Sequence, residues 1–171
     1  MKNFLFLIFL IPFLSNCQSE KTAVSKYPAH IGNVEFDEKI DDTSFKRCLP
    51  EGSYAYQYYS GDSAGIQYKG EKLEIIRILE KEKIQSSKDI NGYITVRFVV
   101  NCEGKAGIFR MQQMDKEYKE KELDQKFSEQ ILSFTKKLNG WIPQEIQGIK
   151  VDYYQYLTFK IEHGKVSEIL P

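Results

Sequence analysis

The feature that most restricts the fold of this chain is one stretch of alternating hydrophobicity, residues 93–100. Its apolar residues occupy every second position: Ile94, Val96, Phe98 and Val100. Successive side chains of a β-strand point to opposite faces, so this pattern predicts a strand with one buried face. Such a strand needs neighbouring strands and a second layer over its apolar face.

Three further strands are expected after it. A turn containing a glycine follows the alternating stretch, and residues 106–111 run back as the second strand of an antiparallel hairpin. Residues 151–161 alternate again and predict a long strand. The pair His163 and Gly164 indicates a tight turn, after which residues 165–170 can fold back as a short last strand.

Two helices are expected between and before these strands. Residues 71–84 begin with glutamate, end with lysines and carry apolar residues at helical spacing. A second stripe recurs every three or four residues at Leu123, Phe127, Ile131, Phe134 and Leu138. Together with a short strand among the tyrosines of residues 54–59, this order predicts an α+β fold. We expect a small antiparallel sheet of three to four strands, packed against one or two helices.

The N-terminus has the pattern of an export signal. A basic start at residues 1–3 precedes an apolar run at residues 4–14, which is too short to span a bilayer. Residues 14–17 read Leu-Ser-Asn-Cys and resemble the lipobox of bacterial lipoproteins. The resemblance implies cleavage before Cys17 and lipidation of its thiol, with the membrane reached through the lipid anchor only. A plain signal peptide is the alternative.

This interpretation divides the chain into four parts. Residues 1–16 are expected to be the lipoprotein signal peptide, and residues 17–33 a lipidated cysteine with a flexible tether. An irregular, aromatic-rich extension follows at residues 34–69, and the folded domain at residues 70–171. The expected location is the cell envelope, in the outer membrane facing the periplasm or the surface.

The remaining cysteines are Cys48 and Cys102, an even pair in a compartment where disulfides persist. A disulfide between them is the expected arrangement. Two buried free thiols are one alternative, and a metal site that recruits His163 and a carboxylate is another. No Cys-x-x-Cys spacing supports the metal site, and no cofactor is expected.

Composition and motifs argue against two classes of function. The chain has 24 basic and 24 acidic residues, without the excess of positive charge that nucleic-acid binding usually needs. Residues 61–65 match the Gly-x-Ser-x-Gly pattern of hydrolases, with Ser63 in the middle and Asp152 and His163 downstream. The segment after Ser63 does not predict the helix that such a nucleophile requires. We therefore do not expect an enzyme, and a serine hydrolase stays the less favoured alternative.

The order of several elements resembles the C-terminal domain of TonB. These elements are a Gly-led strand at residues 92–100, Gly104, an amphipathic helix, Trp141-x-Pro143, Gly148 and a final long strand. Tyr68-x-Gly70 upstream also resembles a short motif that precedes this domain in bacterial relatives. The chain lacks the uncleaved membrane helix and the long proline-rich spacer of TonB itself. The resemblance therefore extends to fold and binding habit rather than to energy transduction.

Membership of this family implies binding of a protein or extended peptide segment by strand addition, and an association with TonB-dependent transport. The expected binding edge is the last long strand, through Tyr154, Tyr156, Thr158 and Lys160. The short strand at residues 165–170 is expected to compete for the same edge. The tyrosines are interpreted either as sheet packing or as an exposed aromatic patch for a peptide or glycan. A structural envelope lipoprotein with no open edge is the alternative function.

Overall fold

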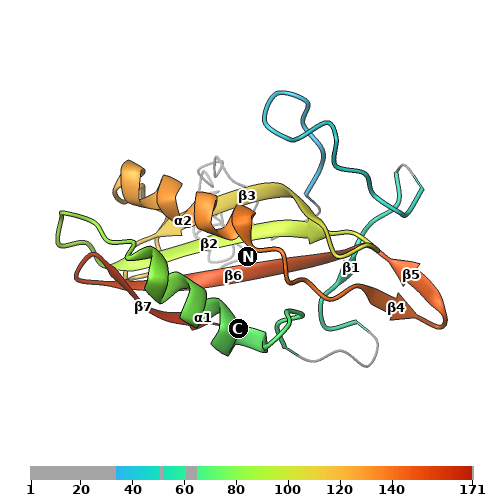
Figure 1. The fold of residues 1–171 in the computed structure, drawn as a ribbon. Helices are drawn as coiled ribbons and strands as arrows, with labels where there is room; N and C mark the ends of the chain where they lie inside the picture. Colours follow the sequence, from blue (N-terminus) through green and yellow to red (C-terminus); the bar gives the residue numbers. More distant parts are fainter. Residues whose placement is uncertain (1–33, 51, 61–64, 171) are drawn as a thin grey trace, which may run out of the picture. The chain divides into compact units, whose positions relative to one another are not determined.

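The computed structural model describes residues 34–50, 52–60 and 65–170. The described part is an α+β fold with two helices, a five-stranded sheet and a separate two-stranded sheet (Figure 1). Its elements are β1 (Tyr56–Gln57), α1 (Glu71–Glu82), β2 (Gly92–Val100), β3 (Ala106–Met114), α2 (Gln125–Lys137), β4 (Gln144–Ile146), β5 (Ile149–Val151), β6 (Tyr153–Glu162) and β7 (Lys165–Leu170).

The large sheet is built around β2 and β6. Their antiparallel pairing runs from Gly92 opposite Ile161 to Val100 opposite Tyr153. β3 pairs with the other side of β2 in the predicted hairpin. The far side of β6 is shared by two short strands, β1 in parallel and β7 in antiparallel orientation. The two edges of the sheet are therefore β3 on one side, and β1 with β7 on the other.

Both helices cover the same face of this sheet (Figure 1). The predicted stripe of α2 is buried at Phe127, Ile131 and Phe134, and α1 buries Ile75 and Leu79. These side chains enclose the core with the apolar faces of β2 and β6. No helix in the described ranges has the length and apolarity needed to cross a membrane.

The predicted α+β class is confirmed, but the predicted sheet is wrong in two respects. It has five strands rather than three to four, and the β1–β6 pair makes it mixed rather than antiparallel. The long strand begins at Tyr153 because Val151 belongs to the β4–β5 hairpin. Asp152 lies between the two strands, and its buried carboxylate binds the extension at residues 34–50.

Candidate functional site

The four residues of the predicted binding edge lie in β6, on the sheet face that the helices do not cover. Their side chains already have partners on that face. The Tyr156 hydroxyl lies 3.4 Å from that of Tyr58, and this hydrogen bond, with burial, raises the pKa of Tyr156 to about 12. The Thr158 hydroxyl lies 3.0 Å from that of Thr95. The guanidinium of Arg97 lies 4.4 Å from the ring centroid of Tyr154.

Lys160 is the fourth residue of that set, and it forms an ion pair along its own strand. Its Nζ lies 2.7 Å from a carboxylate oxygen of Glu162. The hydrogen bond raises the pKa of the Lys160 ammonium and lowers that of the Glu162 carboxyl. The pair is partly exposed, so it contributes little to stability.

The backbone of β6 is occupied on both sides along most of its length. β2 lies on one side throughout, and on the other side β1 pairs with Tyr153 and Tyr154. β7 pairs from Thr158 to Glu162, as the sequence indicated. Between them the Gln155 side chain donates to the carbonyl of Tyr156 and accepts from the backbone N–H of Gln67. A peptide would therefore have to displace β7 to pair with β6 beyond Thr158.

The outer edge of β7 is different. In the described residues its only partner on that side is Gln85, which forms an isolated bridge with Lys165 at the start of the strand. The strand then carries a β-bulge at Ser167, because Val166 pairs with Ile161 and Glu168 with Lys160. Beyond the bridge, the backbone groups on this edge are available to another strand.

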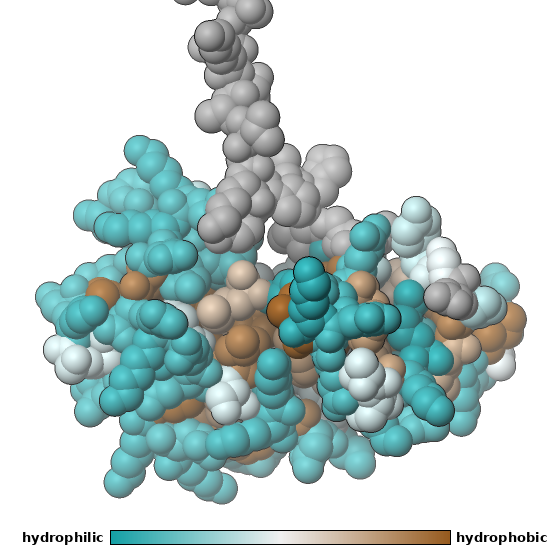
Figure 2. Space-filling model, turned by 90° about the horizontal axis from the view of Figure 1, so that it is seen from above, coloured by the Kyte–Doolittle hydropathy of each residue, from teal (hydrophilic) through white to brown (hydrophobic). Residues whose placement is uncertain are grey.

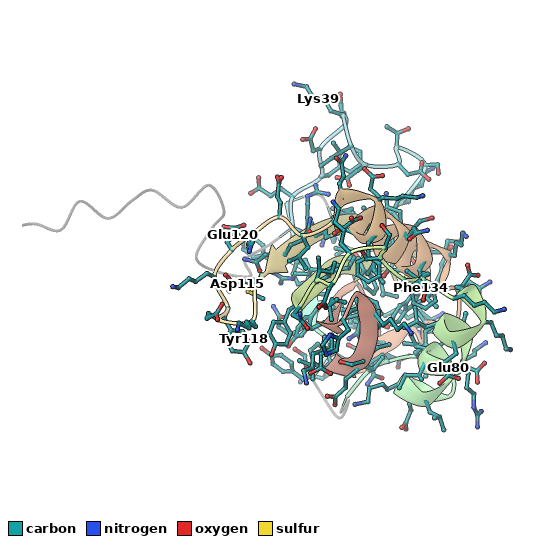
Figure 3. The ribbon with its side chains drawn as sticks, turned by 90° about the vertical axis from the view of Figure 1, so that its left-hand side faces the viewer. Lys39, Glu80, Asp115, Tyr118, Glu120 and Phe134 are labelled. Carbon is teal, nitrogen blue, oxygen red and sulfur yellow. A yellow bond between two sulfur atoms is a disulfide. The ribbon has the colours of Figure 1, made fainter. Side chains whose placement is uncertain are left out.

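A groove of about 410 Å³ lies beside that edge, between α1 and β7. The apolar residues that line it come from both elements and from the segment after α1: Ile76, Leu79, Ile84, Val166 and Ile169. Its charged residues are Glu80, Lys83, Lys165 and Glu168, and Figure 3 shows Glu80 on α1. A free strand edge beside an apolar groove supplies the two elements of strand addition: backbone hydrogen bonds and pockets for alternate side chains.

The opposite edge of the sheet, β3, is protected against added strands. Ile108 has a φ of 55°, which is strained for a β-branched residue, and it forms a bulge opposite Phe98. The carbonyl of Phe109 accepts from the Arg110 side chain, and that of Gln113 accepts from the N–H of Lys121. Bulges and capped carbonyls are common protections of an exposed strand edge. Both edges carry a bulge, but β3 also has capped carbonyls and a bridge from Met114 to Glu120, whereas β7 borders the groove of about 410 Å³. Of the two sheet edges, β7 therefore offers the better binding geometry.

Cys48 and Cys102 are joined by a disulfide, which confirms the predicted pair. The bridge connects the extension at residues 34–50 to the turn between β2 and β3. His163 follows the end of β6 that pairs with Gly92, whereas Cys102 follows the opposite end of β2, so the length of these strands separates them. The Nδ1 of His163 lies 3.1 Å from a carboxylate oxygen of Asp89. In the residues described, no group of three or more His, Cys, Asp or Glu side chains is arranged to hold a metal ion.

The residues of the alternative hydrolase hypothesis are not brought together. Asp152 precedes β6 and His163 follows it, so the ten residues of that strand separate them, a distance of about 35 Å. The Asp152 carboxylate is bound to Arg47 and to backbone N–H groups. Ser63 lies outside the described residues, as does the predicted lipidation site Cys17.

Two features of this site were not identified from the sequence. The groove depends on α1, whose apolar residues indicate only a helix that packs on something. The bridge between Gln85 and Lys165 joins segments 80 positions apart and has no local signal. The only indication in the sequence that a binding site could lie at this edge was the short, charged last strand at residues 165–170.

Comparisons with known proteins found no relative of this chain. No family model matches the chain, no curated protein matches it, and no solved structure matches its fold.

Proposed function

We propose that this protein is a lipid-anchored envelope protein that binds an extended segment of another protein by strand addition at the outer edge of β7. The observation that carries the proposal is the edge of β7 beyond the Gln85 bridge, which pairs with no other described residue and lies next to the groove of about 410 Å³. Backbone hydrogen bonds to β7 would provide affinity, and the apolar groove would select side chains of the bound segment.

Addition to β7 is preferred over replacement of β7 because of Ile169. This side chain is fully buried in the main core, opposite Phe159 of β6. Its removal from the core would cost about 1.5–3 kcal/mol, and the incoming segment would have to restore that burial. Addition to the outer edge leaves Ile169 in place. The site therefore moves from the predicted edge of β6 to the next strand outward.

The TonB-like character of the domain is part of this proposal. It is supported by the order of elements from β2 to β7 and by Trp141, which is buried against Phe98 in the core. The proposal includes association with TonB-dependent transport through a bound segment, but not energy transduction by this chain. The alternative is a structural envelope lipoprotein whose β7 edge binds nothing.

The anchor is tested with the Cys17→Ala variant. Cys17 is the only cysteine at the end of the apolar run, so the variant should not be lipidated. We expect wild-type protein in the membrane fraction and the variant in the soluble fraction of the same cells, since a lipid anchor requires that thiol. A variant that still sediments with membranes after a high-salt wash would show that another feature anchors the protein.

The binding site is tested with peptides selected on the full-length protein from a random decapeptide library displayed on phage. The variant is Ile76→Glu, which places a carboxylate in the groove, and the control is Leu73→Glu, one turn earlier on α1 and 57% exposed. Calorimetry should show binding about tenfold weaker or worse for Ile76→Glu, because the charge must be desolvated. The control should bind as the wild type does.

Failure to select any peptide would favour the structural lipoprotein. Equal binding by both variants would also contradict the proposal, because it would place the peptide away from the groove. Circular dichroism on each variant establishes that α1 is intact before the affinities are compared.

A further inference from the structure

A second and larger groove, of about 880 Å³, lies at the opposite edge of the sheet from β7. Three segments line it: the extension from Ile40 to Cys48, the turn after β2 with the first residues of β3, and the C-terminal end of α2. Figure 2 shows the molecule from this side, with apolar residues exposed between hydrophilic ones. The volume is at the upper end of the range for ligand pockets.

The extension that forms one wall has almost no regular secondary structure, yet it is fixed at several points. The Cys48–Cys102 disulfide ties it to the β2–β3 turn. The Asn101 side chain donates to the carbonyl of Lys46 at 2.8 Å. The ring of Phe45 lies on Gly107, where an added Cβ would collide with it. These contacts hold the wall in a fixed position on the domain.

A further ion pair holds the first part of the same wall. Arg110 of β3 binds the Asp41 carboxylate with both terminal nitrogens, each at 2.7 Å. Burial alone would raise the pKa of Asp41, but the hydrogen bonds from Arg110 and the Asp37 N–H lower it overall. Asp41 thus stays ionised and its charge is neutralised by Arg110, so it does not repel an anion in the groove.

The remaining charges around the groove are predominantly positive. Glu103 is paired with Lys105, and Arg47 with Asp152. In the part of the chain that the structure describes, no ion pair involves Lys46 on the extension, or Lys136 and Lys137 at the end of α2. Among the carboxylates that line the groove, that of Asp42 has no cationic partner in the described residues; it accepts from the Ser44 N–H.

These lysines therefore lie on both walls, and the surface of the groove between them is partly polar and partly apolar. Nζ of Lys136 lies 5.6 Å from the ring centroid of Phe109, and Phe45 and Leu138 line the groove as well. Lysines on both walls, together with the rings of Phe45 and Phe109, match a ligand that carries several carboxylates and apolar side chains. The chain's own residues 18–33 are not such a ligand, because they contain one acidic residue, Glu20, and two basic residues, Lys21 and Lys26.

We infer that this groove binds an acidic, extended segment of a second protein, with its carboxylates at Lys46, Lys136 and Lys137 and its apolar side chains on Phe45 and Phe109. The site is separate from the edge of β7 and does not depend on the function proposed there. Binding is by side chains and the groove walls, since the bulge at Ile108 obstructs strand addition to β3.

The test uses two synthetic eight-residue peptides with capped ends, one of alternating glutamate and phenylalanine and one with glutamine in place of each glutamate. The full-length protein should bind the acidic peptide, and binding should weaken as the salt concentration rises. Lys46→Glu combined with Lys136→Glu should weaken it by about tenfold or more, because attraction on both walls becomes repulsion. Lys81→Glu combined with Lys119→Glu makes the same change of charge at two exposed sites outside the groove and should leave it unchanged.

Three results would overturn the inference: no measurable binding of the acidic peptide, equal affinity for the glutamine peptide, or equal loss in both double variants. The Ile76→Glu variant separates the two sites of the protein. If the acidic peptide binds where we infer, Ile76→Glu leaves its affinity unchanged. A loss of affinity in that variant would assign the peptide to the groove beside β7 and contradict the inference.

Discussion

Replacing Asp152 with alanine is expected to lower the free energy of unfolding by about 3–5 kcal/mol. The Asp152 side chain is fully buried and accepts from the Arg47 Nε at 3.2 Å and from the N–H groups of Cys48 and Leu49. Its removal leaves a partly buried guanidinium and two backbone donors without their acceptor. Urea unfolding followed by the fluorescence of Trp141, the single tryptophan, measures the change.

The exposed carboxylate of Asp42 provides the control for this prediction, because Asp42→Ala removes a carboxylate of the same extension that binds only Ser44. The two alanine variants should differ clearly in their urea midpoints. Equal midpoints would mean that the contacts of Asp152 do not hold the extension on the sheet, and the wall of the larger groove would then lack one of its supports.

Replacing both Cys48 and Cys102 with serine is expected to destabilise the protein by about 4 kcal/mol, since the bridge closes a large loop in the unfolded chain. The sulfurs join residues 54 positions apart in sequence. The same urea experiment measures the loss, and reduction of the wild-type protein should reproduce it. Unchanged stability after complete reduction would contradict the prediction.

The disulfide and Asp152 hold neighbouring residues of the extension, so their contributions should not add. A protein that lacks both should lose less than the sum of the separate losses, because the first change already frees the segment that the second would release. Simple additivity would show that the two contacts stabilise independent parts of the domain.

Much of the fold follows from local pattern. The alternation from Ile94 to Val100 identified β2 and its buried face, and the stripe through Phe127 and Ile131 identified α2. In both elements the period of the apolar residues is itself the structural signal. The cysteine pair was predictable because, with Cys17 expected to carry lipid, only Cys48 and Cys102 remained.

The strand order was not predictable in the same way. β1 has two residues, and its parallel pairing with β6 has no local signal. Three-residue strands β4 and β5 are too short to show a period, so only their turn was visible in the sequence. The pairing of β7 with β6 was predictable from the turn at His163 and Gly164, but the burial of Ile169, which holds β7 in place, was not. For that reason the binding surface was expected on β6 rather than on β7.

Asp152 illustrates the same limit for a single residue. In the sequence it was a candidate member of a hydrolase triad, because nothing local distinguishes a structural carboxylate from a reactive one. Its role comes from partners in residues 47–49, more than a hundred positions earlier. Contacts over such separations are set by the tertiary fold and leave no periodic trace.

The most direct test of the central claim is an NMR measurement of contacts between a library-selected peptide and the isotope-labelled full-length protein. Addition to β7 predicts cross-strand nuclear Overhauser effects from the peptide backbone to Val166 and Ile169, while those between β6 and β7 persist. Loss of the β6–β7 contacts, with new ones from the peptide to Thr158 or Lys160, would show that the peptide replaces β7. Contacts to neither strand would contradict strand addition altogether.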